Sequence, residues 1–235
     1  MRVRVGTSGF SYKEWKGSFY PKDIKNPDML RYYAERFDTC EINNTFYRMP
    51  SGDLLGGWAE QVPEGFEFVL KAPQRITHQK RLNAVEEDVA FFFTTAERMG
   101  AKLGPALFQL PPYSKKDLPR LDAFLRSVPE GRRVALEFRH ESWHADDVYE
   151  CLRARNAALC LADTDEEPIT AVHATADWGY VRLRRLAYDE AALAAWAERV
   201  SSQSWRDAFV FFKHEDEGTG PRFAAAFREA LAQRK

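Results

Sequence analysis

The chain has 235 residues, of which 45 % are hydrophobic, 29 % charged and 14 % aromatic, and this composition excludes a disordered or fibrous protein. Lys and Arg total 34 against 35 Asp and Glu, so the net charge of -1 argues against a protein that binds polyanions over its whole surface. No apolar run reaches the roughly 18 residues of a membrane span, and the first six residues do not form the apolar segment of a signal peptide. We therefore expect a cytoplasmic protein with no membrane partner.

Eight short runs rich in β-branched and aromatic residues alternate with stretches of helical periodicity. The runs are 2–6, 40–43, 66–71, 106–110, 133–138, 158–162, 179–183 and 208–213. Helical periodicity follows at 28–36, 53–61, 85–99, 118–127, 145–155, 189–200 and 222–233, and is weakest in the sixth connection, 163–178. Strands that alternate with helices in this way predict a single (β/α)8 TIM-type barrel domain over residues 1–235. The alternative is a doubly wound open sheet, but no Gly-x-Gly-x-x-Gly follows any run.

Alternation along each run predicts which side chains enter the barrel. Successive residues of a barrel strand point alternately toward the helices and toward the interior. Because the apolar residues of each run suit the helix layer, the polar residues between them are predicted to point inward. These are Glu41, Asn43, Lys71, Gln109, Glu137, Arg139, Asp163 and Arg182. The eighth strand is ambiguous, and we place Lys213 inward rather than His214 because Lys213 follows the charge placement of its neighbours.

The inward polar residues stand at the carboxyl ends of their strands, where barrel enzymes place their chemistry, whereas the amino ends are mostly apolar. The charges at this mouth are five basic residues against three acidic ones, and the excess predicts a small anionic ligand such as a phosphate or carboxylate. The basic residues are Lys71, Arg139, Arg182, Arg184 and Lys213, and the acidic residues are Glu41, Glu137 and Asp163. The alternative is an internal salt-bridge layer whose charges neutralise one another.

Five motifs spread over nearly the whole chain are specific enough to suggest a family. They are Gly6-Thr7-Ser8-Gly9-Phe10-Ser11-Tyr12 with Trp15, Glu41-Ile42-Asn43-Asn44-Thr45-Phe46-Tyr47, Lys71-Ala72-Pro73 with Ile76-Thr77-His78, Leu107-Phe108-Gln109-Leu110-Pro111-Pro112, and Glu137-Phe138-Arg139-His140 with Ser142-Trp143. They resemble the YecE-like family, catalogued as domain of unknown function 72. The resemblance implies a TIM-type barrel and a family whose reaction is not established.

This chain departs from the family pattern at its last two strands. Residues 212–216 read Phe-Lys-His-Glu-Asp where many members resemble Phe-Asn-Asn-Asp. Residues 182–185 read Arg-Leu-Arg-Arg where a His-Gly pair is frequent. The mouth of this chain is therefore expected to be more basic than that of its relatives.

Two further groups are candidate binding residues. The glycine-bounded turn 6–9, which includes Ser8, either presents backbone N–H groups to an anion or simply makes a tight turn. Aromatic residues of the loops either stack on a sugar or base or pack as the loops' own small core. These aromatic residues are Phe10, Tyr12, Trp15, Phe46, Tyr47, Tyr113 and Trp143, and His78 joins the candidates through its motif.

Glu41 and Glu137 lie on the second and fifth runs, across the predicted barrel, so they are candidates for paired carboxylates in acid–base catalysis. Basic neighbours such as Lys71 would keep them ionised and favour a general base. Two alternatives are open: the carboxylates only form ion pairs, or Lys71 or Lys213 forms a Schiff base with a carbonyl substrate. We predict no metal and no cofactor. The alternative is one divalent ion on Glu41, Glu137, Asp163 or His214.

The leading hypothesis is a metal-independent hydrolase, lyase or isomerase that acts on a small anionic, sugar-like molecule. Glu137 or Glu41 would be the general base, and Arg139, Arg182 and Lys213 would hold the anion. A second hypothesis is a nucleic-acid-processing or nucleic-acid-binding protein, which would need a basic track built from residues 115–116, 132–133 and 184–185. A third is a ligand sensor without catalytic activity.

Overall fold

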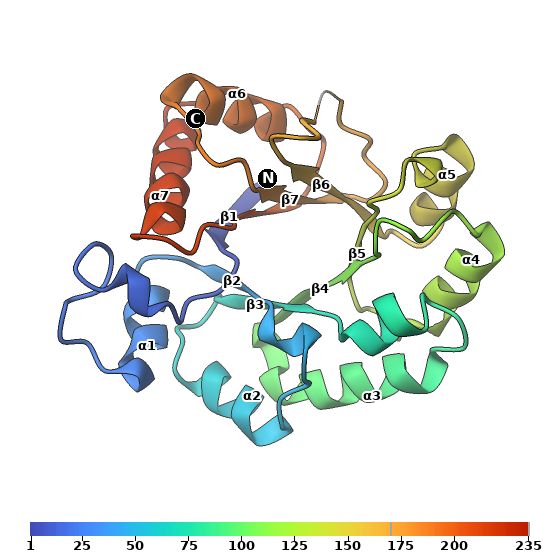
Figure 1. Ribbon diagram of the computed structural model, residues 1–235, viewed down its shortest axis with the longest axis horizontal. Coiled ribbons are helices and arrows are strands. Elements are labelled where there is room, and N and C mark those ends of the chain that lie inside the picture. The colour runs from blue at the N-terminus through green and yellow to red at the C-terminus, as the bar shows by residue number, and fades with distance from the viewer. Residues whose placement is uncertain (170, 235) are drawn as a thin grey trace.

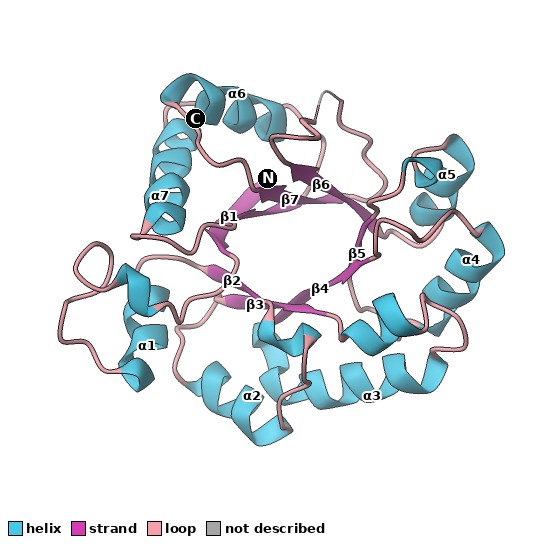
Figure 2. Cartoon of the chain, in the orientation of Figure 1, coloured by secondary structure: helices cyan, strands magenta, loops and turns pink. Residues whose placement is uncertain are grey.

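Eight parallel strands form one sheet that curls into a nearly closed barrel, seen end-on in Figures 1 and 2. The computed structural model describes residues 1–169 and 171–234. The strands follow the order β1-β8-β7-β6-β5-β4-β3-β2, so each lies beside its neighbour in sequence, as in a TIM-type barrel. They are β1 (Arg2–Thr7), β2 (Thr39–Ile42), β3 (Glu67–Lys71), β4 (Leu103–Gln109), β5 (Val134–Glu137), β6 (Ala158–Asp163), β7 (Trp178–Leu183) and β8 (Asp207–Phe212). The predicted barrel is confirmed.

Helices cover the outside of the barrel (Figure 2). They are α1 (Met29–Ala34), α2 (Gly52–Glu60), α3 (Glu86–Ala96), α4 (Leu118–Ser127), α5 (Asp146–Arg153), α6 (Glu190–Ser201) and α7 (Thr219–Ala232), with short 3-10 or π segments at Lys13–Trp15, Asn26–Asp28, Asn44–Phe46, Arg75–Gln79, Glu97–Lys102 and Glu141–Trp143. Side chains of Ser51, Asp117 and Asp189 cap α2, α4 and α6 by accepting backbone N–H bonds. The described part of the connection between β6 and β7 contains no helix, and this is where helical periodicity is weakest.

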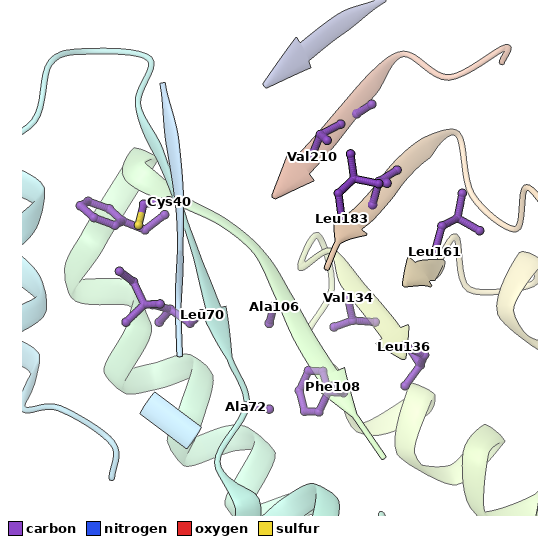
Figure 3. Close-up of a cluster of buried hydrophobic side chains, with 14 of the residues drawn as sticks. Cys40, Leu70, Ala72, Ala106, Phe108, Val134, Leu136, Leu161, Leu183 and Val210 are labelled. Carbon is purple, nitrogen blue, oxygen red and sulfur yellow. The ribbon is translucent and has the colours of Figure 1, made fainter. Parts of the chain in front are cut away.

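Alternate residues of the strands form the hydrophobic layer between sheet and helices. Figure 3 shows this layer, in which Leu70, Phe108, Leu136 and Leu183 are all completely buried. Each such side chain contributes about 1.5–3 kcal/mol when it leaves water. Because these residues face the helices, their neighbours in sequence must face the interior. The predicted inward direction is therefore confirmed for Glu41, Lys71, Gln109, Glu137 and Arg182.

The barrel interior is filled in layers. The middle layer is apolar and tightly packed, and consists of Val69, Leu107, Ala135, Ala158, Cys160, Trp178, Tyr180, Phe209 and Phe211. Below it, at the amino ends of the strands, Arg133 donates to Glu67 at 2.8 Å and to Asp207 at 2.9 Å, and Arg4 also pairs with Glu67. We call Arg4, Glu67, Arg133 and Asp207 the floor layer. We expected mostly apolar residues at the amino ends of the strands, and this expectation is wrong. Alternation along a strand also directs inward the residue two positions before an inward one, and in the floor layer these residues are charged.

The barrel closes weakly between its first and second strands. Within the described residues, β1 and β2 share one bridge at their carboxyl ends, Ser8 with Glu41. Further down, the Tyr33 hydroxyl of α1 accepts the Thr7 N–H at 2.8 Å and donates to the Thr39 carbonyl at 3.0 Å. This hydroxyl therefore replaces a direct strand-to-strand hydrogen bond.

Replacing Tyr33 by phenylalanine should lower the free energy of unfolding by about 1–3 kcal/mol, because it leaves a buried N–H and a buried carbonyl without a partner. Thermal or urea unfolding measures the effect. The matched control is Tyr32→Phe, since Tyr32 is only half-buried and its hydroxyl makes no hydrogen bond within the described chain. Equal stability of the two variants would contradict this role for Tyr33.

Candidate functional site

One arginine joins two carboxylates at the centre of the carboxyl mouth. Arg182 of β7 donates from Nη1 to Glu137 Oε2 at 2.6 Å and from Nη2 to Glu41 Oε1 at 2.9 Å. At most 2 % of each of the three side chains is exposed. We call Glu41, Glu137 and Arg182 the buried triad. Both terminal nitrogens of Arg182 donate to protein carboxylates, while its Nε is buried without a partner in the described residues. This pairing corrects the prediction that Arg182 is free to hold a ligand anion.

Glu41 receives three further hydrogen bonds, from Ser8 Oγ at 2.7 Å, Tyr180 Oη at 2.6 Å and Asn43 Nδ2 at 3.3 Å. Burial favours the neutral form of Glu41, but the Arg182 charge and the hydroxyl donors outweigh it, so the pKa of this carboxyl is lowered. Ser8 therefore supports Glu41 and has its hydroxyl committed to it. Tyr180 is a site residue that the sequence analysis missed, although the parity of β7 places it on the same face as Arg182.

Glu137 lies across the barrel from Glu41 and has its own set of donors. Gln109 Nε2 donates at 2.5 Å, and Arg184 Nη1 lies 3.5 Å away. Burial would raise the pKa of Glu137, but Arg182 and Arg184 lower it to about 2. Both carboxylates are therefore ionised at neutral pH, and Glu137 is a weak base.

Lys71, at the end of β3, is positioned by an amide and an aromatic ring and not by a carboxylate. Its Nζ donates to Gln109 Oε1 at 2.8 Å and lies 4.2 Å from the centre of the Phe46 ring. No acidic side chain in the described chain lies within ion-pair distance of it. Burial and the positive charge of Arg182 lower the pKa of Lys71 to about 8. About a tenth of the molecules therefore carry a neutral amine here at pH 7.

Gln109 has a fixed orientation between these two groups. The ionised carboxylate of Glu137 only accepts hydrogen bonds, so the Gln109 amide must point its nitrogen at Glu137. The amide oxygen is then directed at Lys71. Gln109 therefore holds the lysine in place and links it to the buried triad.

Further basic side chains surround the mouth. Lys213 follows β8 on the inward side, is half-buried, and makes no ion pair within residues 1–169 and 171–234. Burial, Arg184 and Arg182 lower the pKa of Lys213. Arg139 is exposed at the rim of the mouth. Burial and the positive charges of Lys71 and Arg139 lower the pKa of His78. Basic groups therefore outnumber carboxylates at the mouth.

Asp163 lies outside this site, which corrects its predicted inward direction. It accepts hydrogen bonds from Tyr188 at 3.1 Å and Trp196 at 3.2 Å, and pairs with Arg185 on the helix side of the barrel. The inward residues of β6 are Ala158, Cys160 and Ala162. Small side chains are needed there because the aromatic rings of β7 and β8 already fill the middle layer. His214 also faces the helices, in line with the inward placement of Lys213.

Two of the aromatic residues predicted to bind a ligand are packing residues instead. Trp15 is completely buried beside Tyr20, and Trp143 stacks on Phe138 with 4.5 Å between ring centroids. The Trp143 indole donates to the Ser114 carbonyl at 2.7 Å. Neither ring can reach a ligand at the mouth, so these two predictions are wrong.

The remaining aromatic residues of the loops lie in different places. Phe46 is at the site, where its ring meets His78 edge-on with centroids 4.8 Å apart. Tyr47 and Tyr113 are 75 % and 64 % exposed and stand at the surface. Tyr12 and Asn43 line a separate cavity of about 430 Å³ between the loops after β1 and β2 and helix α2.

The turn after β1 offers no anion site on its backbone. The Ser8 N–H donates to the Phe212 carbonyl at 3.0 Å, and the Gly9 N–H donates to the Glu41 carbonyl at 2.7 Å. Gly6 is required for space, because a Cβ atom there would lie 2.1 Å from the Thr39 carbonyl oxygen. The glycines serve the close approach of β1 and β2, and the anion-binding interpretation of residues 6–9 is wrong.

In the part of the chain that the structure describes, no three His, Cys, Asp or Glu side chains converge as a metal site would require. None of the described helices combines the length and hydropathy of a membrane span.

Comparison with known proteins identifies relatives of the chain. The profile of the family described as "Protein of unknown function DUF72" matches residues 4–235. The UPF0759 protein YecE of Escherichia coli is 32 % identical over 117 residues, which are 49 % of this chain and 43 % of YecE. The UPF0759 protein YunF of Bacillus subtilis is 28 % identical over 63 % of this chain and 54 % of YunF. The matches thus span about half the length of these curated relatives.

Solved structures agree with the fold. A DUF72 family protein from Thermotoga maritima superposes with a TM-score of 0.84 at 29 % identity, over 99 % of this chain and 100 % of that one. A DUF72 family protein from Enterococcus faecalis superposes with a TM-score of 0.81 at 20 % identity, over 98 % of this chain and 95 % of that one. With its barrel, its motifs and a family profile that covers nearly its whole length, the chain belongs to the DUF72 family of proteins of unknown function.

Proposed function

We propose that this protein is a metal-independent enzyme that binds a small anionic, sugar-like molecule at the carboxyl mouth of the barrel. The observation that carries the proposal is the surplus of basic groups around the buried triad. Arg182 pairs with two carboxylates of the triad, whereas Lys71 and Lys213 have no acidic partner in the described chain and Arg184 has only a 3.5 Å contact. Cations left unpaired close to one another favour an anionic ligand.

The roles of the site residues follow from their partners. Lys213, Arg184 and, at the rim, Arg139 are available to hold the anion, because none is fully engaged by a carboxylate. Lys71 is the group best suited to move a proton or attack the ligand, since its pKa of about 8 lies near neutral pH. Glu41 and Glu137 keep the site charged and ordered, because a carboxyl with a pKa of about 2, as in Glu137, is a poor base.

The placement of the basic pairs favours a small ligand over a nucleic acid. Arg133 belongs to the floor layer at the opposite end of the barrel from Arg184. Lys116 is paired with Asp147, with its Nζ 2.9 Å from the carboxylate. A duplex needs a basic track that continues well beyond one site. Arg133 cannot extend such a track from the mouth, and Lys116 is neutralised by its acidic partner.

Phosphate and sulfate should raise the melting temperature by a few degrees more than chloride at equal ionic strength, because a ligand that binds only the folded state stabilises it. Both anions also stabilise proteins generally by exclusion from their surfaces. The test therefore compares the parent with Arg184→Met/Lys213→Met, which should lose the specific part of the gain. Differential scanning calorimetry at increasing anion concentration provides the measurement.

The matched control removes two cations elsewhere, Arg98→Met/Arg126→Met. Both side chains are more than 60 % exposed; Arg98 lies in the short segment before β4, and Arg126 lies in the last turn of α4. This control should gain as much stability from phosphate as the parent. A gain that is equal in all three proteins would refute anion binding at the mouth. A ligand that stabilises the parent but is never converted would indicate a sensor.

A further inference from the structure

We propose that Lys71 forms an imine with the carbonyl carbon of the ligand, so that the ligand is a small molecule carrying both a carbonyl and an acidic group. The inference rests on the proposed function, which it deepens by naming the ligand chemistry. Imine formation needs a lysine that loses its proton near neutral pH, has its nitrogen lone pair directed at open space, and lies beside groups that bind the rest of the substrate.

The lone pair of Lys71 is directed by Gln109. The Gln109 oxygen accepts one N–H from Nζ at 2.8 Å, and Glu137 fixes that oxygen by binding the amide nitrogen at 2.5 Å. An amide oxygen accepts a hydrogen bond from the ammonium and from the neutral amine alike. When Nζ of Lys71 loses a proton, its hydrogen bond to the Gln109 oxygen therefore remains. The lone pair of Nζ then points away from Gln109.

The surroundings of Lys71 favour the neutral amine and still accommodate an imine. The Lys71 side chain lies at the carboxyl end of β3 and is half-buried rather than enclosed in the core. Burial and the positive charges of Arg182 and Lys213 disfavour a further cation at Lys71, and together they outweigh the carboxylates of Glu41 and Glu137, which act in the opposite direction. The Phe46 ring, 4.2 Å from Nζ, faces the nitrogen and would also face a protonated imine, whose charge its π-electrons stabilise.

The reaction needs no redox partner. The neutral Nζ attacks the carbonyl carbon, and the carbonyl oxygen takes up a proton to give a carbinolamine. This intermediate loses its hydroxyl together with a proton from nitrogen as one water molecule, and a C=N bond remains. The acidic group, one to three bonds from the carbonyl carbon, is the part of the ligand that Arg184 and Lys213, the cations without full carboxylate partners, would bind.

Reductive trapping tests the inference. The protein is incubated with cyanoborohydride, which converts an imine irreversibly into a secondary amine, and with pyruvate, glyoxylate, dihydroxyacetone phosphate or, as a neutral comparison, acetone. Peptide mass mapping then locates the label. We expect at least one anionic carbonyl compound to label Lys71 more than ten times faster than the exposed Lys13 and Lys22, which serve as internal controls. Selective labelling by the oxo acids alone or by the phosphate ester alone identifies the acidic group.

The pH dependence of labelling provides a second readout. The fraction of neutral Lys71 rises as the pH rises through about 8, so its labelling should reach a plateau near pH 9. Lys71→Arg, which keeps the positive charge, should abolish the selective label while retaining the parent's melting temperature within a few degrees.

Labelling of Lys71 no faster than of Lys13, or equally fast with acetone, would overturn the inference. Mapping on the parent protein gives this answer even if a variant fails to fold. Failure of the inference is distinguishable from failure of the proposed function. If phosphate stabilises the parent through Arg184 and Lys213 but no carbonyl compound labels Lys71, the anion site stands and the imine does not.

Discussion

Arg182→Met should destabilise the fold by about 3–5 kcal/mol, because it leaves two buried carboxylates without their common cation. For a chain of this length that loss lowers the melting temperature by about 6–20 °C. Arg182 is 1 % exposed, so water cannot replace the guanidinium. Differential scanning calorimetry or urea unfolding at pH 7 measures the effect.

Two matched variants separate this cause from simple loss of positive charge. Lys213→Met removes a cation from the same mouth but breaks no ion pair in the described structure, so its melting temperature should stay close to that of the parent. Adding Glu41→Gln and Glu137→Gln to Arg182→Met removes the uncompensated charges and should restore part of the lost stability. An Arg182→Met protein as stable as Lys213→Met would show that the triad does not hold the mouth together.

Acid should remove about 3 kcal/mol of stability through Glu137 alone. The pKa of this carboxyl falls from an ordinary 4.5 to about 2 in the folded protein, where burial is outweighed by Arg182 and Arg184. A carboxyl with a lowered folded pKa contributes its full stability above the ordinary value and loses it as the pH falls toward the folded value. At about 1.4 kcal/mol for each pKa unit, the loss is spread between about pH 5 and pH 2.

Urea unfolding at several pH values between 7 and 3 tests this, with Glu137→Gln as the comparison. The variant cannot titrate at this position, so its free energy of unfolding should fall less steeply below pH 5. Glu41, whose pKa is also lowered, remains in both proteins and gives them a shared background slope. Parallel curves for the parent and Glu137→Gln would mean that Glu137 does not titrate abnormally.

The barrel and most of its inward residues could be predicted because the strands have two unlike faces. In β3, Phe68 and Leu70 alternate with residues that include Lys71, so the direction of the lysine follows from the pattern. In β6 both faces are apolar, with Leu159 and Leu161 on one and Ala158 and Cys160 on the other. The pattern then carries no direction, and the size of the side chains on the neighbouring strands decides which face is inside.

Partners and burial in the loops could not be predicted in the same way. The sequence places Arg182 inward, but only the three-dimensional arrangement shows that Glu41 and Glu137 occupy both sides of its guanidinium. Trp15 and Trp143 look like surface aromatics in loops, yet each is buried by residues that the chain brings together from several elements. Charge counts and loop composition do not contain this information.

The layers inside the barrel close it beneath the carboxyl mouth. The middle layer and the floor layer fill the barrel beneath the triad, with Val69, Leu107 and Phe209 completely buried between the two charged layers. A molecule that enters beside Lys71 must therefore leave the way it came. If the protein turns a substrate over, its product occupies the same exit path that the next substrate needs, so inhibition by product should be competitive with substrate.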